Sequence, residues 1–110
     1  MIKRITLVWK KPELSNAEFR KLWLGEHVEA VKRLPGLREY VICFVTEGPS
    51  DSPAGIATVL FDSREALDTA FGDPKISGDL LRTREQFASR VQPIFVEEDI
   101  VVPRTKIDPR

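Results

Sequence analysis

The sequence predicts a small α+β domain, and three observations lead to this fold class. Four runs rich in β-branched residues are typical of strands, at residues 2–9, 37–47, 55–61 and 94–102. The stretches after the first and third runs carry helix-start signals and apolar residues at helical spacing. The order is therefore β, α, β, β, α, β, the ferredoxin-like plan of a four-stranded antiparallel sheet with helices on one face.

Composition limits the function before any motif is considered. The 110 residues have the size of one domain, and 17 Lys plus Arg balance 17 Asp plus Glu. This zero net charge argues against binding to nucleic acid or an anionic membrane. One cysteine and one histidine make neither an internal disulfide nor a zinc site. Since no apolar run has the length of a membrane span or the form of a signal peptide, we expect a cytoplasmic protein without metal or cofactor.

The first predicted strand is followed by a helix whose start and end are both marked. Ser15 is the expected N-cap, and Glu18 at the third helical position completes a capping box. The helix should end before Pro35 and Gly36, because proline disfavours helical geometry in the residue before it and glycine permits the turn. Its apolar side is formed by Phe19, Leu22, Trp23, His27, Ala30 and Leu34.

The strand predicted at residues 37–47 is apolar on both faces. Alternation along this strand places Tyr40, Ile42 and Phe44 on one face and Val41, Cys43 and Val45 on the other. A two-layer domain with one solvated sheet face does not need a second apolar face, so another layer should cover it. We therefore expect sheet-to-sheet dimerisation, and we interpret Cys43 as a small buried hydrophobic residue.

The second helical stretch contains two helix starts. Asp62 and Glu65 repeat the capping pattern and open a short helix that ends at Gly72. Asp73 and Pro74 then start another helix, with an acidic cap and proline in the first turn.

The end of the chain is predicted from the apolar spacing that follows. Residues Ile76, Leu80, Phe87 and Val91 recur at helical spacing, which predicts a helix up to Pro93. The last strand then covers residues 94–102. We place the single domain at residues 1–103 and a polar C-terminal tail at residues 104–110.

Two classes of protein that share this order of elements are excluded by their residues. Ferredoxins need several cysteine ligands for their clusters, and this chain has one cysteine. RNA-recognition domains expose stacking aromatics on the third strand, whereas residues 55–61 are mostly aliphatic there. Dimerisation is the better interpretation of the second sheet face.

His27 and Tyr40 are the candidates for catalysis. Histidine is the side chain whose unperturbed pKa lies near neutrality, so acid or base chemistry would fall to His27. Tyr40 can donate a hydrogen bond to a carbonyl or phenolate oxygen. Both also have a structural interpretation, in which His27 is half-buried and satisfied by a carbonyl and Tyr40 packs with its hydroxyl at the rim.

Other side chains are candidates for ligand binding. Aromatic residues that would line a pocket for a flat apolar ligand, or simply build the core, are Trp9, Trp23, Phe71 and Phe87. Arg82, Arg84 and Arg90 suit either an anion clamp or an exposed helix face. The sequence has no glycine-rich phosphate loop, nucleophile elbow or paired-carboxylate motif, so phosphoryl transfer and serine hydrolysis have no support.

One combination of residues resembles the EthD family. It consists of Phe19, Trp23 and His27 at intervals of four, then Leu34, Pro35, Gly36 and Leu37, then Tyr40. The resemblance implies a dimeric α+β barrel, in which two ferredoxin-like sheets pack face to face. It also implies a pocket between the sheet and helices of each protomer, with His27 matching a first-helix histidine and Tyr40 a strand tyrosine.

The resemblance also sets the expected function. Members of this superfamily include cofactor-free lactone isomerases, polyketide cyclases, quinone-forming monooxygenases and proteins associated with ether degradation. We expect an oxidoreductase-type enzyme for a small apolar oxygenated or aromatic metabolite, with His27 as acid or base and Tyr40 polarising an oxygen. The alternatives are isomerase or cyclase chemistry, a non-catalytic binding or accessory dimer, and haem binding through His27. Relatives of the isomerase and cyclase type add a second histidine, which this chain lacks.

Overall fold

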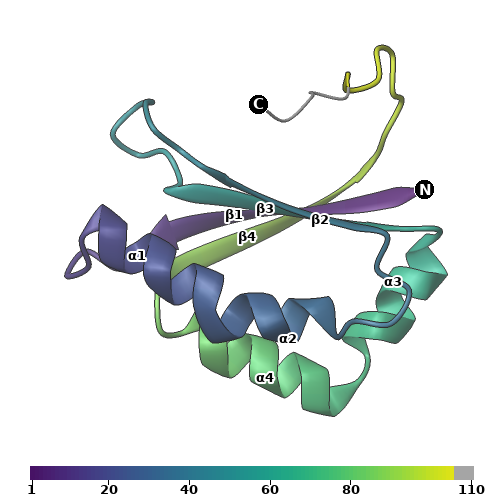
Figure 1. Ribbon diagram of the computed structural model, residues 1–110, viewed down its shortest axis with the longest axis horizontal. Helices are drawn as coiled ribbons and strands as arrows, with labels where there is room; N and C mark the ends of the chain where they lie inside the picture. Colours follow the sequence, from purple (N-terminus) through teal and green to yellow (C-terminus); the bar gives the residue numbers. More distant parts are fainter. Residues whose placement is uncertain (106–110) are drawn as a thin grey trace.

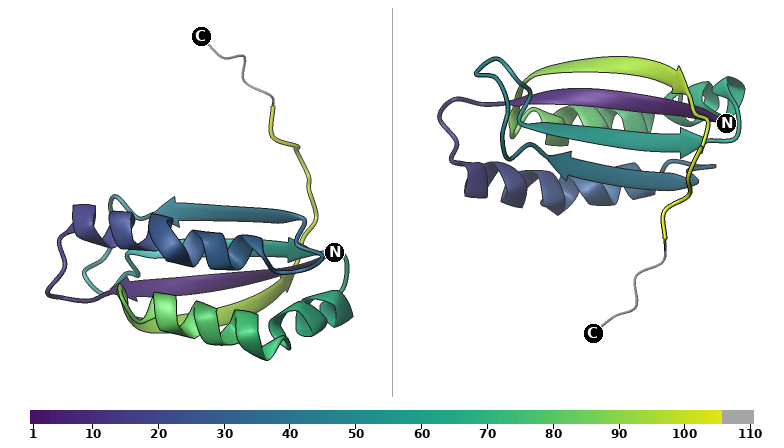
Figure 2. Two further views of the ribbon diagram at one scale, coloured as in Figure 1. Left: turned by 60° about the horizontal axis from the view of Figure 1, so that its bottom comes forward. Right: turned by 90° about the horizontal axis from the view of Figure 1, so that it is seen from above.

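The computed structural model describes residues 1–105, and these residues form the predicted α+β fold. Four antiparallel strands make one sheet in the order β2-β3-β1-β4. They are β1 (Ile2–Lys10), β2 (Glu39–Phe44), β3 (Gly55–Phe61) and β4 (Ala88–Glu97). The helices all lie on one side of the sheet (Figure 1), and the view from the other side shows the strands uncovered (Figure 2, right). The last five residues of the predicted tail, 106–110, lie outside the described residues.

The capping box predicted at Ser15 starts α1 (Asn16–Leu22). Ser15 Oγ accepts a hydrogen bond from the Glu18 backbone N–H at 3.1 Å, and Glu18 Oε1 accepts one from the Ser15 N–H at 2.9 Å. The pair satisfies two donors that the first helical turn leaves without partners.

The predicted single helix is interrupted at the residues of greatest interest. A π-helical turn, η1 (Trp23–His27), separates α1 from α2 (Val28–Lys32). Gly25 inside this turn has a non-helical ψ of −122°. A π turn inserts an extra residue into the helix and changes which side chains face inward, and such turns are frequent at functional sites. The turn ends at His27.

The second helical stretch forms α3 (Arg64–Phe71) and α4 (Pro74–Arg84). The predicted cap Asp62 is wrong by one residue: Ser63 is the cap, and its hydroxyl accepts the N–H of the third helical residue at 3.1 Å. The Asp73 cap is confirmed, since its carboxylate accepts two N–H groups of the first turn of α4 at 2.9 and 3.2 Å.

The prediction of a helix up to Pro93 and a strand at 94–102 is wrong. The helix α4 ends at Arg84, and β4 includes Pro93 in its middle, opposite Thr6 of β1. A proline is tolerated there because β4 is an edge strand, where alternate N–H groups have no neighbouring strand to bond. Phe87, which we predicted within the helix, lies in the turn before β4 and is fully buried.

The core between sheet and helices has two parts. One contains Val8, Phe19, Trp23 and Phe87. The other contains Val31, Leu34, Val59, Phe61, Leu67 and Ala70. Members of both parts line the cavity described below, so the two parts meet around it.

The sheet face without helices is mostly apolar, as predicted. Alternation along the strands and the strand register place on it Ile5, Leu7, Trp9, Val41, Cys43, Ile56, Leu60, Ile94 and Val96. Cys43 is exposed and Ile94 is 40% exposed, so our prediction of a buried Cys43 is wrong for the single chain. Residues 98–105 leave the end of β4 on this same side (Figure 1). Within residues 1–105, the helices are all too short or too polar to cross a membrane.

Candidate active site

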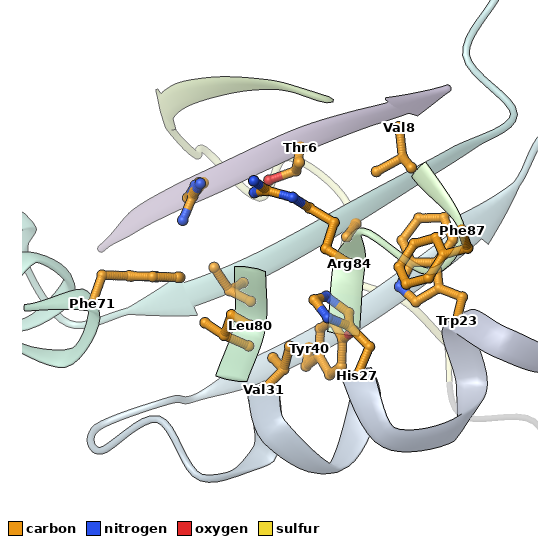
Figure 3. Close-up of a pocket in the computed structure, with 13 residues that line it drawn as sticks. Thr6, Val8, Trp23, His27, Val31, Tyr40, Phe71, Leu80, Arg84 and Phe87 are labelled. Atoms are coloured by element: carbon orange, nitrogen blue, oxygen red, sulfur yellow. The ribbon is translucent and has the colours of Figure 1, made fainter. Parts of the chain in front are cut away.

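A cavity of about 70 Å³ lies between the sheet and the helices (Figure 3). Its polar lining residues are Arg4, Thr6, Trp23, His27, Tyr40 and Arg84. Its apolar lining residues are Val8, Val31, Ala57, Val59, Phe71, Leu80 and Phe87. The volume is below the roughly 300–1,000 Å³ of typical small-molecule pockets. The interior therefore suits the reacting end of a ligand, while the rest of the ligand would lie at the opening of the cavity.

Five of the six residues proposed for the site from sequence line this cavity, namely Trp23, His27, Tyr40, Phe71 and Phe87. Trp9 does not, because it alternates with the helix-facing Val8 and so lies on the opposite face of the sheet. Its indole N–H donates to the Asp51 carbonyl at 3.1 Å, and the Arg90 guanidinium lies 4.3 Å from its ring centroid. Trp9 is therefore removed from the ligand-binding set.

The hydrogen bonds of Thr83 determine which nitrogen of His27 carries the proton. Thr83 Oγ1 lies 2.7 Å from the Asp79 carbonyl and 2.8 Å from His27 Nδ1. A carbonyl only accepts, so the single hydroxyl proton of Thr83 goes to Asp79. Thr83 Oγ1 must then accept from His27 Nδ1–H. This leaves a lone pair on His27 Nε2, which makes no hydrogen bond to residues 1–105.

The surroundings of His27 keep it neutral. Burial, together with the smaller effect of the positive charge of Arg84, lowers the pKa of His27 to about 4. The imidazole and the Phe87 ring also pack in a T-shaped arrangement, with 5.3 Å between centroids. At neutral pH the site therefore presents an uncharged imidazole with an open acceptor at Nε2.

This shift predicts a pH-dependent stability with a definite sign. Because the pKa of His27 is about 4 in the folded protein and near 6.5 when unfolded, the unfolded chain binds the extra proton first. Above pH 6.5 His27 is neutral in both states, and the free energy of unfolding has its full value. As the pH falls from 6.5 toward 4, protonation of His27 in the unfolded chain lowers the free energy of unfolding by about 2–3 kcal/mol. Urea unfolding across this range should show the loss in the wild type. His27→Gln should lack that part of the slope, and an equal slope in the variant would contradict the burial of a neutral His27.

Tyr40 and Trp23 contribute two buried donors. The Tyr40 hydroxyl and the Trp23 indole N–H are both buried and form no hydrogen bond of normal geometry. Burial raises the pKa of Tyr40 to about 12, while the nearby indole N–H of Trp23 opposes the rise. Tyr40 thus stays protonated at neutral pH. Buried polar groups normally have partners, so two such donors at one cavity indicate a place for a ligand oxygen.

The structure adds residues that sequence reasoning missed. Arg4 and Thr6 project from β1 toward the helices, on the same side as Val8, and both line the cavity. The sequence carried one signal for Arg4: alternation along the first strand places this cation on the side that faces the helices. Of the arginines considered as an anion clamp, only Arg84 reaches the cavity, whereas Arg82 pairs at the surface with Glu26 at 3.2 Å.

The cavity does not fit a haem group, because its interior is far smaller than the macrocycle that His27 would have to ligate. Among residues 1–105, no three His, Cys, Asp or Glu side chains gather in a way that would hold a metal ion.

Comparison with known proteins supplies the family. The model of the EthD domain matches residues 11–91, which is most of the chain. The chain belongs to the EthD family. No curated protein matches it significantly.

Solved structures share the EthD fold of this chain at low sequence identity. An EthD family protein from Bacillus halodurans has 18% identity and a TM-score of 0.73, over 90% of this chain and 100% of that one. SnoaB, a cofactor-independent oxygenase from Streptomyces nogalater, has 10% identity and a TM-score of 0.67, over 94% and 97%. A dimeric ferredoxin-like protein of unknown function from Thermobifida fusca has 10% identity and a TM-score of 0.68, over 86% and 88%. At these identities the likeness establishes the fold.

Proposed function

We propose that this EthD family protein is a cofactor-independent enzyme that removes a proton from a small oxygenated or aromatic compound, with His27 as the base. The observation that carries the proposal is the neutral His27, whose Nε2 lone pair is open while Thr83 holds Nδ1–H. A general base needs a free lone pair, a fixed orientation and a substrate within hydrogen-bond reach. The cavity beside His27 supplies room for the substrate.

The first step follows from the two donors near His27. A C–H bond next to a carbonyl, or the O–H bond of a phenol, gives its proton to His27 Nε2. The electron pair of the C–H bond moves to the carbonyl oxygen, which becomes an enolate, whereas the pair of the O–H bond stays on its oxygen, which becomes a phenolate. Tyr40 and Trp23 donate hydrogen bonds to this oxygen, and such pre-positioned donors stabilise the developing charge. The imidazolium is stabilised in turn by the anion formed beside it.

The fate of that anion separates the candidate reactions. Reaction with dioxygen gives the oxidoreductase that we favour, consistent with the cofactor-independent oxygenase SnoaB on the same fold. Return of the proton at another carbon gives an isomerase. Attack of the enolate carbon on a carbonyl of the same molecule, whose oxygen then takes up the proton, gives a cyclase. All of these reactions share the proton removal assigned to His27.

The proton removal is tested by hydrogen–deuterium exchange. The protein is incubated in D₂O with a panel of small phenols, quinols and β-dicarbonyl compounds, and loss of the C–H signal is followed by NMR. We expect exchange above the uncatalysed rate for at least one class, and loss of that excess in His27→Gln. A wild-type protein that binds panel members without accelerating exchange would favour the non-catalytic binding or accessory role.

We also propose that the functional unit is a homodimer in which the open sheet faces pack together. This face is apolar and includes the exposed Cys43 and Ile94, and the structural relative from Thermobifida fusca is described as dimeric. A domain of this size buries only about two-thirds of its unfolded surface, so a second sheet would add needed core.

The dimer is tested by light scattering at micromolar concentration. We expect twice the chain mass of 12.5 kDa for the wild type and a monomer for Ile94→Glu, which places a charge on the open face. Leu81→Glu is the matched control, because Leu81 is similarly exposed at 48% but lies on α4. A monomeric wild type, or equal disruption by Leu81→Glu, would contradict packing through the sheet.

A further inference from the structure

We propose that the substrate carries a carboxylate, which binds between the guanidinium groups of Arg4 and Arg84 in the cavity. The inference rests on the cavity being the active site proposed above, and it names the substrate class. It replaces the expectation of an apolar metabolite without a charged group.

The first observation is the unbalanced charge of the cavity. Its lining includes Arg4 and Arg84 but no Asp or Glu. Four arginines of the described residues pair with carboxylates, namely Arg33, Arg38, Arg64 and Arg82. Among the same residues, the unpaired Arg20, Arg90 and Arg104 are exposed to solvent, whereas Arg4 and Arg84 line the cavity. Neither Arg4 nor Arg84 forms an ion pair within residues 1–105. Two cations that share a cavity repel each other, and an anion between them removes that repulsion.

The second observation is that Arg4 is held in place with an unused donor. Its Nε is buried and has no hydrogen-bond partner. Its guanidinium lies 4.5 Å from the centroid of the Phe71 ring, a contact that restrains the planar group. Both Arg4 and Arg84 line the cavity, where burial and the charge of Arg84 lower the pKa of Arg4. A fixed guanidinium fork matches the two oxygens of a carboxylate.

The third observation is the position of Arg84 relative to His27. Arg84 extends from α4 into the cavity toward Thr6 of β1, while His27 and Tyr40 lie beside it (Figure 3). His27 lines the same cavity as Arg84, and the charge of Arg84 adds to the burial that lowers the pKa of His27. A carboxylate held by Arg84 therefore occupies the cavity that His27 also lines.

A carboxylate that the ligand already carries explains Arg4 and Arg84 better than a negative charge that develops on the substrate only during the reaction. Tyr40 and Trp23 already offer donors to a developing oxyanion. Two permanent cations, present in the resting protein without a counter-charge, correspond instead to a permanent anion in the ligand. The small interior fits a carboxylate and the carbon atoms next to it.

The test compares two probes of the same shape and different charge, benzoate and benzamide. Binding is measured by titration calorimetry and by tryptophan fluorescence, to which Trp23 in the cavity contributes. We expect benzoate to bind in the millimolar range or tighter and at least about tenfold more tightly than benzamide. Arg4→Gln and Arg84→Gln should each weaken benzoate binding about tenfold or more, and Arg84→Lys should weaken it less because it keeps the charge.

Arg82→Gln is the matched control. It removes one positive charge from the same helix, but Arg82 is exposed and paired with Glu26 and Asp79 outside the cavity. It should leave benzoate binding unchanged. Absence of benzoate binding at millimolar concentration, equal binding of benzamide, or equal weakening by Arg82→Gln would overturn the proposal. Thermal unfolding of each variant confirms that it is folded, and Arg84→Gln tests the pair if Arg4→Gln does not fold.

The same measurements separate this proposal from the proposed function. Benzoate binding needs no turnover, so His27→Gln should still bind benzoate in preference to benzamide. Selective binding without any catalysed proton exchange would retain the anion site and remove the catalytic role of His27. Catalysed exchange without selective binding of benzoate would retain the catalytic role of His27 and remove the anion site.

Discussion

Replacing His27 with Gln is expected to lower the rate of catalysed proton exchange by about 10²–10⁴-fold, the usual contribution of a positioned general base. Glutamine has an amide N–H that can donate to Thr83, so the contact that orients the side chain can be kept. Its amide cannot accept a proton near neutral pH. The exchange rate is measured by NMR in D₂O, and ligand affinity is measured in parallel. Affinity should change little, which separates loss of the base from loss of the pocket.

Thr83→Val provides the companion variant for His27. It removes the acceptor for His27 Nδ1–H while keeping a similar shape, so the tautomer is no longer fixed. We expect a smaller loss of rate than in His27→Gln, accompanied by a mixed tautomer in ¹⁵N spectra of the imidazole. An unchanged exchange rate in His27→Gln would exclude His27 as the base.

Replacing Gly55 with Ala is expected to destabilise the protein by about 3 kcal/mol, at the upper end for overpacking of a core. An added Cβ would lie 2.3 Å from Trp23 Cζ3 and 3.0 Å from Cη2. Trp23 is only 1% exposed and cannot easily move, because it stacks on Phe87 with 5.2 Å between centroids and 16° between planes and meets Phe44 edge-on at 5.5 Å. Urea unfolding measures the change in the free energy of unfolding.

Gly78→Ala is the matched control for Gly55→Ala. Gly78 lies in α4, is exposed, and an added Cβ would meet nothing within 4 Å. Alanine should stabilise the protein there by about 0.5–1 kcal/mol through helix propensity. Equal stability changes in the two variants would show that close packing of Trp23 against β3 is not what requires glycine at position 55.

The parts of the fold that were predictable from sequence depend on local signals. Alternation of apolar residues gave the bounds of β3, and the Ser15 capping box marked the start of α1. The position of β4 was not predictable in this way, because Phe87 and Val91 continue a helical spacing by coincidence. Only pairing with β1 shows that Pro93 is at a sheet edge, where proline is tolerated.

The candidate site was predictable only for those residues that carry a local signal in the sequence. His27, Tyr40 and three aromatic residues carry chemical or spacing signals of their own and were selected. Thr83 was missed because its role depends on α4 packing against η1, a contact between residues 56 positions apart. Arg4 was missed because arginine in a strand is usually exposed, and only the tertiary structure shows it facing a cavity without a counter-charge.

The catalytic account depends on the state of one imidazole, which NMR measures without knowledge of the substrate. The protein has a single histidine, so ¹⁵N-labelled His27 gives an unambiguous pair of ring signals. The structure predicts protonation at Nδ1, an unprotonated Nε2 at neutral pH, and a pKa of about 4. A titration midpoint near the ordinary 6.5, or a proton on Nε2 in the resting protein, would contradict the assignment of His27 as a buried neutral base.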